Sequence, residues 1–225
     1  MSLAIIIPML NEEAIIVPAL EKLRAINAQL ILVDGGSTDR TLSLAKQAGF
    51  AQGLAAPPGR AQQMNFGAHY AQTDILLFLH LDCSLPAGAI EKAEKALQDP
   101  EVVGGAFSLG FSPASWGLNI IGHMANLRSR LTGVPYGDQA IFVRRSAFNK
   151  LGGFSPIPIM EDVDLCRRLK KLGRLVIIKD KVLASPRRWQ KSGMLRTTWR
   201  NWFLLTLYHL GFSPERLVRF YSQVR

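Results

Sequence analysis

The sequence predicts an α/β fold in which a mostly parallel, mixed sheet is flanked by helices. In the first half of the chain, short apolar runs alternate with amphipathic stretches of helical period, separated by polar or glycine-rich turns. The apolar runs are continuous rather than alternating, which predicts strands covered on both faces of the sheet. The 225 residues, of which 48% are hydrophobic, suffice for a large core.

Three buried strands and the helices between them account for residues 1–100. The expected strands span 3–10, 30–34 and 74–82, and the expected helices lie in 13–25, 40–48, 57–72 and 84–100. Ser37, Thr38 or Asp39 can cap the second of these helices. Pro86 and Pro100 delimit the last one, since proline is tolerated at a helix start and common beyond its end.

The pattern changes after residue 101. A glycine-rich strand over 102–111 is followed by a helix over 116–131, a strand over 140–145, a helix over 161–172, a strand over 174–180 and an apolar amphipathic helix over 195–210. We expect the sheet to continue here in mixed orientation. With no repeat or low-complexity linker, one continuous domain with a C-terminal helical extension is the economical interpretation.

Charge is distributed unevenly along the chain. Residues 1–143 hold 9 basic and 12 acidic side chains, a net of −3, whereas residues 144–225 hold 18 basic and 5 acidic, a net of +13. This asymmetry predicts an anionic partner for the second half: nucleic acid, a membrane surface or a phosphorylated substrate. No nucleic-acid-binding motif is recognisable, so nucleic acid is not expected.

The cysteine count and the apolar segments indicate the cellular setting. Cys83 and Cys166 do not form a disulfide framework, so a reducing, cytoplasmic location is expected. The N-terminus lacks the basic region of a signal peptide. No apolar segment reaches the roughly 18 to 20 residues that a membrane-spanning helix requires.

Acidic and turn residues follow the predicted strands. They are Asn11-Glu12-Glu13, Asp34-Gly35-Gly36 and His80-Leu81-Asp82, with Asp138 and the acidic cluster of 161–164 later in the chain. Ligands of parallel α/β sheets bind beyond the carboxyl ends of the strands. One carboxylate there is commonplace and can cap a helix, but several on one edge predict a polar site for a metal ion and a phosphorylated ligand.

Four motifs give the chain a family resemblance. PMLNEE, VDGGSTDRT, FLHLDCS and MEDVDLCRRL occur in the order and approximate spacing of the family 2 glycosyltransferases, which have the GT-A fold. GRAQQMNFGA, LHLD, YGDQAIFVRR and SPRRW resemble the bacterial subgroup called radical-SAM/selenodomain-associated transferase 2. The resemblance implies a GT-A domain over 1–190, with a nucleotide-binding part (1–100) and an acceptor-side part (101–190), and a helical extension over 191–225.

The resemblance also implies which residues contact a nucleotide-diphosphate sugar. These residues are Pro8, Glu12, Asp34, Arg60, Asp82, Asp138, Arg188 and Trp189. Asp34 matches the residue that accepts a hydrogen bond from the nucleobase, and Arg60 at a helix start suits a pyrophosphate. Simpler roles remain open: Asp34 as a helix cap, Arg60 as a solvated loop residue and Trp189 as a packed aromatic.

The metal ligands and the general base are implied in the same way. Asp82 and His80 occupy the place of the DxD motif, which holds Mn²⁺ or Mg²⁺, and the imidazole favours Mn²⁺. His80 can equally serve as a neutral hydrogen-bonding residue. Family 2 enzymes are generally inverting, and the resemblance assigns the general base to Asp162. The alternative is an acidic helix start that pairs with Arg167 or Arg168.

The acceptor and the assembly state are less specified. Trp199, Trp202, Phe203, Thr206, Leu207 and Leu210 form a stripe on the helix over 195–210. Such a stripe is usually core or a homodimer contact, but beside arginines it also suits docking on anionic lipid at the inner face of a membrane, with a lipid-linked or anionic acceptor. The rival functions are a nucleotidyltransferase, a nucleotide-sugar-binding protein without turnover and a basic nucleic-acid-binding protein.

Overall fold

The computed structural model of the protein describes residues 1–50 and 54–221, and the side chain of Arg188 lies outside the described part. Its strands are β1 (Leu3–Met9), β2 (Gln29–Asp34), β3 (Leu54–Ala55), β4 (Ile75–Phe78), β5 (Cys83–Ser84), β6 (Val102–Phe111), β7 (Ile141–Arg144) and β8 (Arg174–Ala184). Its helices are α1 (Ile16–Arg24), α2 (Thr41–Gln47), α3 (Arg60–Tyr70), α4 (Ala89–Ala96), α5 (Trp116–Thr132), α6 (Arg145–Lys150), α7 (Glu161–Leu169), α8 (Arg187–Ser192), α9 (Met194–His209) and α10 (Pro214–Leu217).

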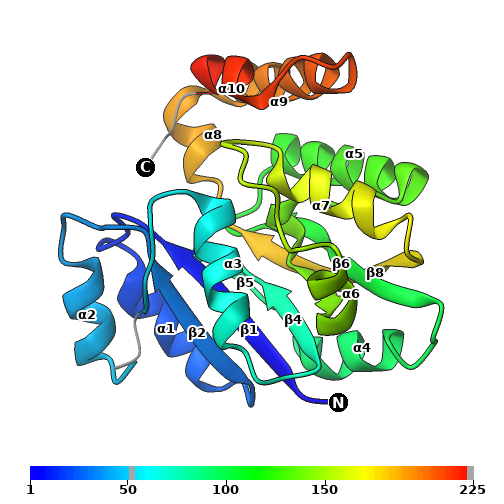
Figure 1. Ribbon diagram of the computed structural model, residues 1–225. Helices are drawn as coiled ribbons and strands as arrows, with labels where there is room; N and C mark the ends of the chain where they lie inside the picture. Colours follow the sequence, from blue (N-terminus) through cyan, green and yellow to red (C-terminus); the bar gives the residue numbers. More distant parts are fainter. Residues whose placement is uncertain (51–53, 222–225) are drawn as a thin grey trace.

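The eight strands of the described residues form one mixed sheet in the order β3-β2-β1-β4-β7-β6-β8-β5 (Figure 1). β1 pairs in parallel with β2 and β4, and β6 with β8. β7 lies antiparallel to both β4 and β6 and so joins the two parallel parts. The predicted α/β class and the mixed orientation of the second half are confirmed.

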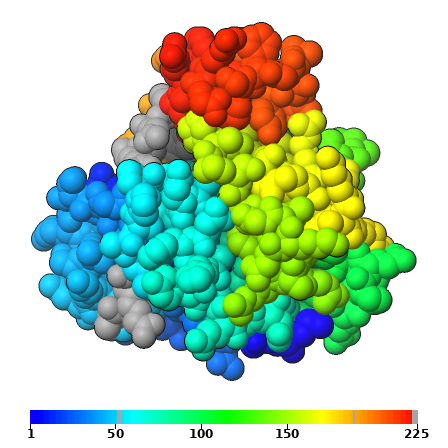
Figure 2. Space-filling model, viewed as in Figure 1, coloured from blue at the N-terminus to red at the C-terminus, as the bar shows by residue number. Residues whose placement is uncertain are grey.

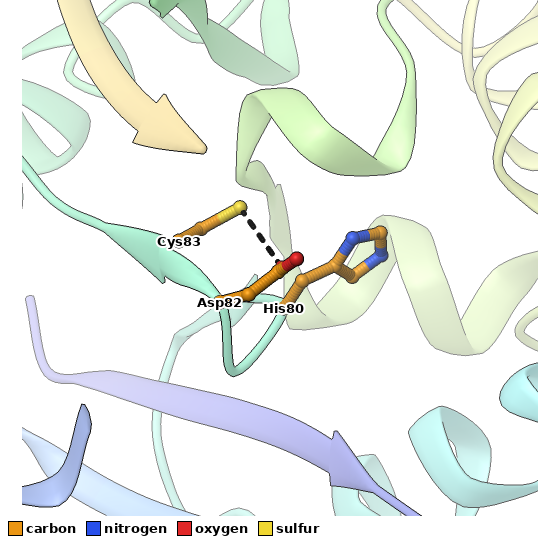
Figure 3. A group of neighbouring side chains, drawn as sticks. All are labelled: His80, Asp82 and Cys83. Carbon is orange, nitrogen blue, oxygen red and sulfur yellow. Dashed lines mark hydrogen bonds between the residues drawn. The ribbon is translucent and has the colours of Figure 1, made fainter. Parts of the chain in front are cut away.

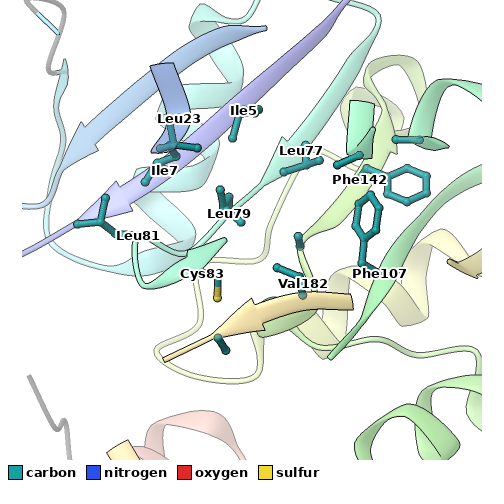
Figure 4. Close-up of a cluster of buried hydrophobic side chains, with 14 of the residues drawn as sticks. Ile5, Ile7, Leu23, Leu77, Leu79, Leu81, Cys83, Phe107, Phe142 and Val182 are labelled. Atoms are coloured by element: carbon teal, nitrogen blue, oxygen red, sulfur yellow. The ribbon is translucent and has the colours of Figure 1, made fainter. Parts of the chain in front are cut away.

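Each buried strand sends alternate side chains to two cores on opposite faces of the sheet. Ile5 and Ile7 of β1 belong to one core, which α1 and α4 help to cover, whereas Ala4 and Ile6 belong to the other, against α3 and α7. Figure 4 shows part of the first core, in which strand residues such as Leu77 gather over one face. The continuous apolar runs therefore reflect burial on both faces.

The central strand β6 is rich in glycine because its neighbours lie close. A Cβ added to Gly105 would lie 2.3 Å from the carbonyl oxygen of Val176, and one added to Gly104 would lie 2.6 Å from that of Phe142. Both values are below any real carbon–oxygen contact. The glycines thus allow β6 to fit between β7 and β8.

Several element boundaries differ from the expectation. The strand expected over 74–82 ends at Phe78, and the amide of Cys83 donates to the carbonyl of His80 to close a turn. β8 runs to Ala184 because it pairs with β6 along its length. Cys83 and Cys166 are both buried and form no disulfide. Across 1–50 and 54–221, no helix is both long and apolar enough to span a membrane.

Candidate active site

The carboxyl ends of β1, β2 and β4 meet at one edge of the sheet, as expected from their parallel pairing. The loops after β1 and β2 are joined directly: the backbone N–H of Thr38 donates to Asn11 Oδ1 at 2.9 Å, and that of Asn11 donates to Ser37 Oγ at 2.9 Å. Asn11 has a φ of 52°, a left-handed conformation that turns the chain sharply after the strand. Pro8 lies partly buried in β1, opposite Val33.

Asp34 at the end of β2 supports its own turn. Its side chain is buried, and Oδ2 accepts hydrogen bonds from the backbone N–H groups of Gly36 and Ser37 at 3.0 and 2.9 Å. Oδ1 accepts the hydroxyl of Ser37 at 2.5 Å. α2 begins only at Thr41, so the carboxylate organises the loop instead of capping that helix. Its contact with a nucleobase stays a prediction.

Gln63 of α3 is a positioning residue that sequence reasoning missed. It is buried, and its side-chain amide donates to the carbonyls of Met9 and Val33 at 2.8 Å each. It thereby clamps the ends of β1 and β2 together. Gly35 packs on this amide so closely that a Cβ there would lie 2.8 Å from Gln63 Cδ. The close packing explains why glycine stands at this position.

His80, Asp82 and Cys83 form a compact group after β4, with one potential ligand atom of each within 4.8 Å of the others. Figure 3 shows the carboxylate of Asp82 between the sulfur of Cys83 and the ring of His80. Burial, followed by the charge of Asp82, raises the pKa of the Cys83 thiol well above its ordinary value. The thiol therefore stays protonated and donates to Asp82 Oδ1 at 3.7 Å. His80 and Asp82 then offer an imidazole and a carboxylate, a donor pair that can bind a divalent metal ion such as Mn²⁺.

Arg60 and Glu161 face each other beside this group, from the N-termini of α3 and α7. Their charged groups lie 3.6 Å apart. Burial raises the pKa of Glu161 to about 7; the charge of Arg60 opposes this shift and that of Asp162 adds to it. Burial alone would lower the pKa of Arg60, but nearby acidic groups, Glu161 first among them, raise it above its ordinary value. Arg60 therefore begins α3 paired with Glu161, while its side chain stays 43% exposed to solvent.

Asp162 is fixed by two backbone donors. Oδ2 accepts the N–H of Gly137 at 2.6 Å, and Oδ1 accepts that of Val163 at 2.8 Å. Asp162, His80, Arg60 and Glu161 line one cavity of about 10 Å³, room for one water molecule. The structure thus brings together three residues predicted from separate motifs.

The other acidic candidates near α7 are placed differently. Asp164 pairs with Arg168 at 2.8 Å and accepts the hydroxyl of Ser155, which makes it part of the packing of α7. Asp138 lies in the short 3₁₀ turn Gly137–Gln139, next to Cys83, whose thiol lies 4.0 Å from its carbonyl oxygen.

A buried network anchors this turn. The side chain of Gln139 donates to the carbonyl of Phe107 at 3.0 Å and accepts the hydroxyl of Ser129 at 2.7 Å. Arg128 lies over the ring of Tyr136, 3.0 Å from its centroid, and burial lowers the pKa of Arg128 to about 10. The side chain of Gln139 therefore holds this turn against β6 and α5.

Arg187, next to the predicted Arg188, reaches the strand ends. Its guanidinium lies 3.1 Å from Glu12 Oε2 and 3.7 Å from Asp82 Oδ2. The side chain of Arg188 lies outside the described residues, so its predicted diphosphate contact stays a prediction. Trp189 packs edge-on against Phe111, with ring centroids 5.0 Å apart, as expected of a packed aromatic.

Comparisons with known proteins agree with this architecture. Among solved structures, the chain is similar to a mannosyltransferase from Pyrobaculum calidifontis in complex with GDP-Man and Mn²⁺ (TM-score 0.71, 20% identity, covering 95% of this chain and 66% of that one). It is also similar to TarS from S. aureus in complex with UDP-GlcNAc (0.64, 17%, 82% and 58%). A third is glucosyl-3-phosphoglycerate synthase from Mycobacterium tuberculosis in complex with Mn²⁺, UDP and glucosyl-3-phosphoglycerate (0.62, 18%, 81% and 71%).

These likenesses establish the fold, a GT-A arrangement of one mixed sheet flanked by helices. The chain spans less than two thirds of the length of the first two structures. No curated protein matches the sequence. The model of the family "Glycosyl transferase family 2" matches residues 4–152, well over half of the chain. The protein is therefore a member of glycosyl transferase family 2.

Proposed function

We propose that the protein transfers a sugar from a nucleotide-diphosphate sugar to an acceptor hydroxyl with inversion at the anomeric carbon. The observation that carries the proposal is the convergence of Asp162, His80 and Arg60 on one cavity, beside Asp82. A base, candidate metal ligands and a cation for a diphosphate are the groups that such a displacement needs. The similar mannosyltransferase and TarS are in complex with GDP-Man and UDP-GlcNAc, respectively.

In the proposed reaction, Asp162 accepts the proton of the acceptor hydroxyl. The acceptor oxygen forms a bond to the anomeric carbon, and the bond from that carbon to the diphosphate oxygen breaks. The nucleoside diphosphate leaves with the electron pair. The N–H groups of Gly137 and Val163 orient the carboxylate, so little reorganisation is needed when the hydroxyl arrives.

Arg60 and Arg187 would be the cations that bind the diphosphate. Arg60 pairs with Glu161, and Arg187 pairs with Glu12 and lies 3.7 Å from Asp82. Glu12 would therefore act through Arg187. Asp82 and His80 would hold Mn²⁺ or Mg²⁺, which when bound neutralises charge on the departing diphosphate.

The proposal also covers the domain limits, the other ligand contacts, the subgroup and the cellular location. Residues 1–190 would act as one catalytic domain, supported by the single sheet they share, and residues 191–225 as a helical extension. Asp34 and Pro8 would bind the nucleoside, and Asp138 and Trp189 would lie on the sugar or acceptor side. The motif GRAQQMNFGA supports the radical-SAM-associated subgroup. Two buried unpaired cysteines support a cytoplasmic location.

The test combines donor binding with turnover. UDP-, GDP-, ADP- and dTDP-sugars are screened by thermal shift with and without Mn²⁺, and release of nucleoside diphosphate is followed for each donor that binds. Asp162→Asn should slow release roughly 10²- to 10⁴-fold while the donor still binds. The matched control is Asp180→Asn, an exposed residue paired with Lys92. Stabilisation without turnover in the wild type would favour a binding protein, and no stabilisation by any donor would refute the proposal.

A further inference from the structure

The predicted apolar stripe on α9 lies on the outside of the molecule. Leu195 and Trp199 are 86% and 76% exposed, and the stripe continues through three further exposed residues, Trp202, Phe203 and Leu210. The spacing follows one face of the helix. The opposite face, with Thr197 and Leu204, is buried. Apart from the partly buried Leu207, the stripe is therefore not core.

A second exposed stripe lies on α5. Trp116 is 81% exposed and Leu131 77%, and between them Ile120, Met124 and Leu127 are also exposed. These residues again share one helix face.

The two helices touch near their N-termini, so the two stripes start from adjacent helix ends. A Cβ added to Gly117 of α5 would lie 2.6 Å from the sulfur of Met194 of α9. Trp116 and Leu195 are the chain neighbours of these two residues. We call the exposed apolar residues of both stripes the α5–α9 surface. Figures 1 and 2 show α9 and α10, in orange and red, at one end of the molecule.

Basic residues accompany this apolar surface. Between residues 191 and 221 the chain holds five basic residues and one acidic residue, and 116–132 holds two basic residues and no acidic one. Arg196, Arg216, Arg219 and Arg130 are exposed. A second copy of the chain would bring like charges together, which opposes self-association through this surface. An anionic membrane offers both an apolar interior for the stripes and negative headgroups for the arginines.

We infer that the α5–α9 surface docks the protein on an anionic lipid membrane. Trp and Arg are suited to the headgroup region, because their apolar parts can enter the acyl boundary while their polar ends stay hydrated. The stripes lie on the surface of packed helices, so the docking that we infer is peripheral.

Docking through this surface would hold the candidate active site near the lipid headgroups. The inner face of α9 packs through Leu204 on Ile159, two residues before Glu161, and the preceding helix α8 carries Arg187 to Glu12. An acceptor attached to a lipid would then lie within reach of the site. This consequence rests on the proposed function, whereas docking itself does not require donor, acceptor or turnover.

The experiment is vesicle co-sedimentation of the full chain without donor. Vesicles contain phosphatidylcholine alone or mixed with phosphatidylglycerol. We expect binding to the anionic vesicles that weakens at high salt, since about 1 M salt shortens the screening length to about 3 Å. The double variant Leu195→Ser/Trp199→Ser should bind roughly tenfold more weakly or worse. Its control is Tyr70→Ser, an exposed aromatic on α3.

Two charge-reversal variants complete the test. Arg196→Glu should weaken binding several-fold, whereas Lys46→Glu on α2, which alters net charge equally, should not. The melting temperatures of all variants should stay near that of the wild type, because the replaced side chains are exposed. The inference is overturned if the wild type does not sediment with anionic vesicles, if the stripe variant binds as well, or if light scattering shows a dimer that the stripe variant dissociates.

Discussion

The contact between Gly35 and Gln63 predicts a measurable coupling between the two residues. Gln63→Ala removes the two donors that join the ends of β1 and β2. Gly35→Ala places a methyl group 2.8 Å from the Gln63 side chain and displaces the same amide. Once Gln63 is truncated, the space for that methyl group is free. The double variant should therefore be little worse than Gln63→Ala alone.

The magnitudes follow from the contacts. The carbonyl of Met9 keeps the N–H of Gly35 at 2.9 Å, and Met9 and Val33 both belong to the parallel β1–β2 ladder. At about 1 kcal/mol for each of the two buried hydrogen bonds that are lost, Gln63→Ala should lower the free energy of unfolding by about 2 kcal/mol. Gly35→Ala should lower it by about 1–3 kcal/mol, the usual cost of overpacking.

Urea unfolding followed by circular dichroism measures all four proteins of the double-mutant cycle. We expect the double variant to be about 1–3 kcal/mol more stable than the sum of the single effects predicts. Gln47→Ala, at an exposed position of α2, is the control for losing a glutamine. Additivity within about 0.5 kcal/mol, or a Gln63→Ala effect no larger than that of the control, would refute the clamp.

Three further predictions concern the site and the central strand. Glu161→Gln should gain up to roughly 3 kcal/mol of stability relative to the wild type as pH rises from about 4.5 to about 7. The reason is that a carboxyl group with a raised pKa stabilises the wild type at low pH, and this stability is lost as the group ionises. Urea unfolding midpoints of both proteins at pH 5 and pH 8 check this, and an equal difference at the two pH values would contradict it. Arg187→Ala removes a cation 3.7 Å from Asp82, so Mn²⁺ alone should stabilise this variant at a several-fold lower concentration in a thermal-shift titration. Asp82→Asn should abolish the shift. Weaker Mn²⁺ binding by Arg187→Ala would argue against a competition between Arg187 and the metal for Asp82. Gly105→Ala should cost about 3 kcal/mol or more, because its Cβ would meet the Val176 carbonyl at 2.3 Å, and an unchanged melting temperature would be evidence against that packing.

The longer elements of the fold could be predicted because their signals are local. Continuous apolar runs identified the longer strands, and helical periods located α1 to α5, α7 and α9 to within a few residues. The two-residue strands β3 and β5 and the six-residue helices α6 and α8 were missed. Segments this short contain no full period, and they form because longer neighbours position them.

The candidate site was predictable only in part. The strand-end residues could be placed together because parallel strands end at the same edge of a sheet. Gln63 could not, since nothing in the sequence separates it from Gln62, one residue and about 100° away on the same helix. Arg187 was missed for a similar reason: a motif that aligns residue types did not identify it, although its guanidinium lies 3.7 Å from Asp82 Oδ2.

The stripe on α9 illustrates a limit of periodicity itself. Helical spacing establishes that Trp199, Trp202 and Phe203 share a face, but covering that face requires residues distant in sequence. The contacts that hold α9 on the molecule come instead from Leu204 on the opposite side, which packs with Leu217 and Ile159. Because α9 is anchored through Leu204, its apolar face with Trp199, Trp202 and Phe203 stays exposed and can contact a partner outside the chain. That burial pattern, more than the net charge, is the reason to look for the partner of this helix at a membrane surface.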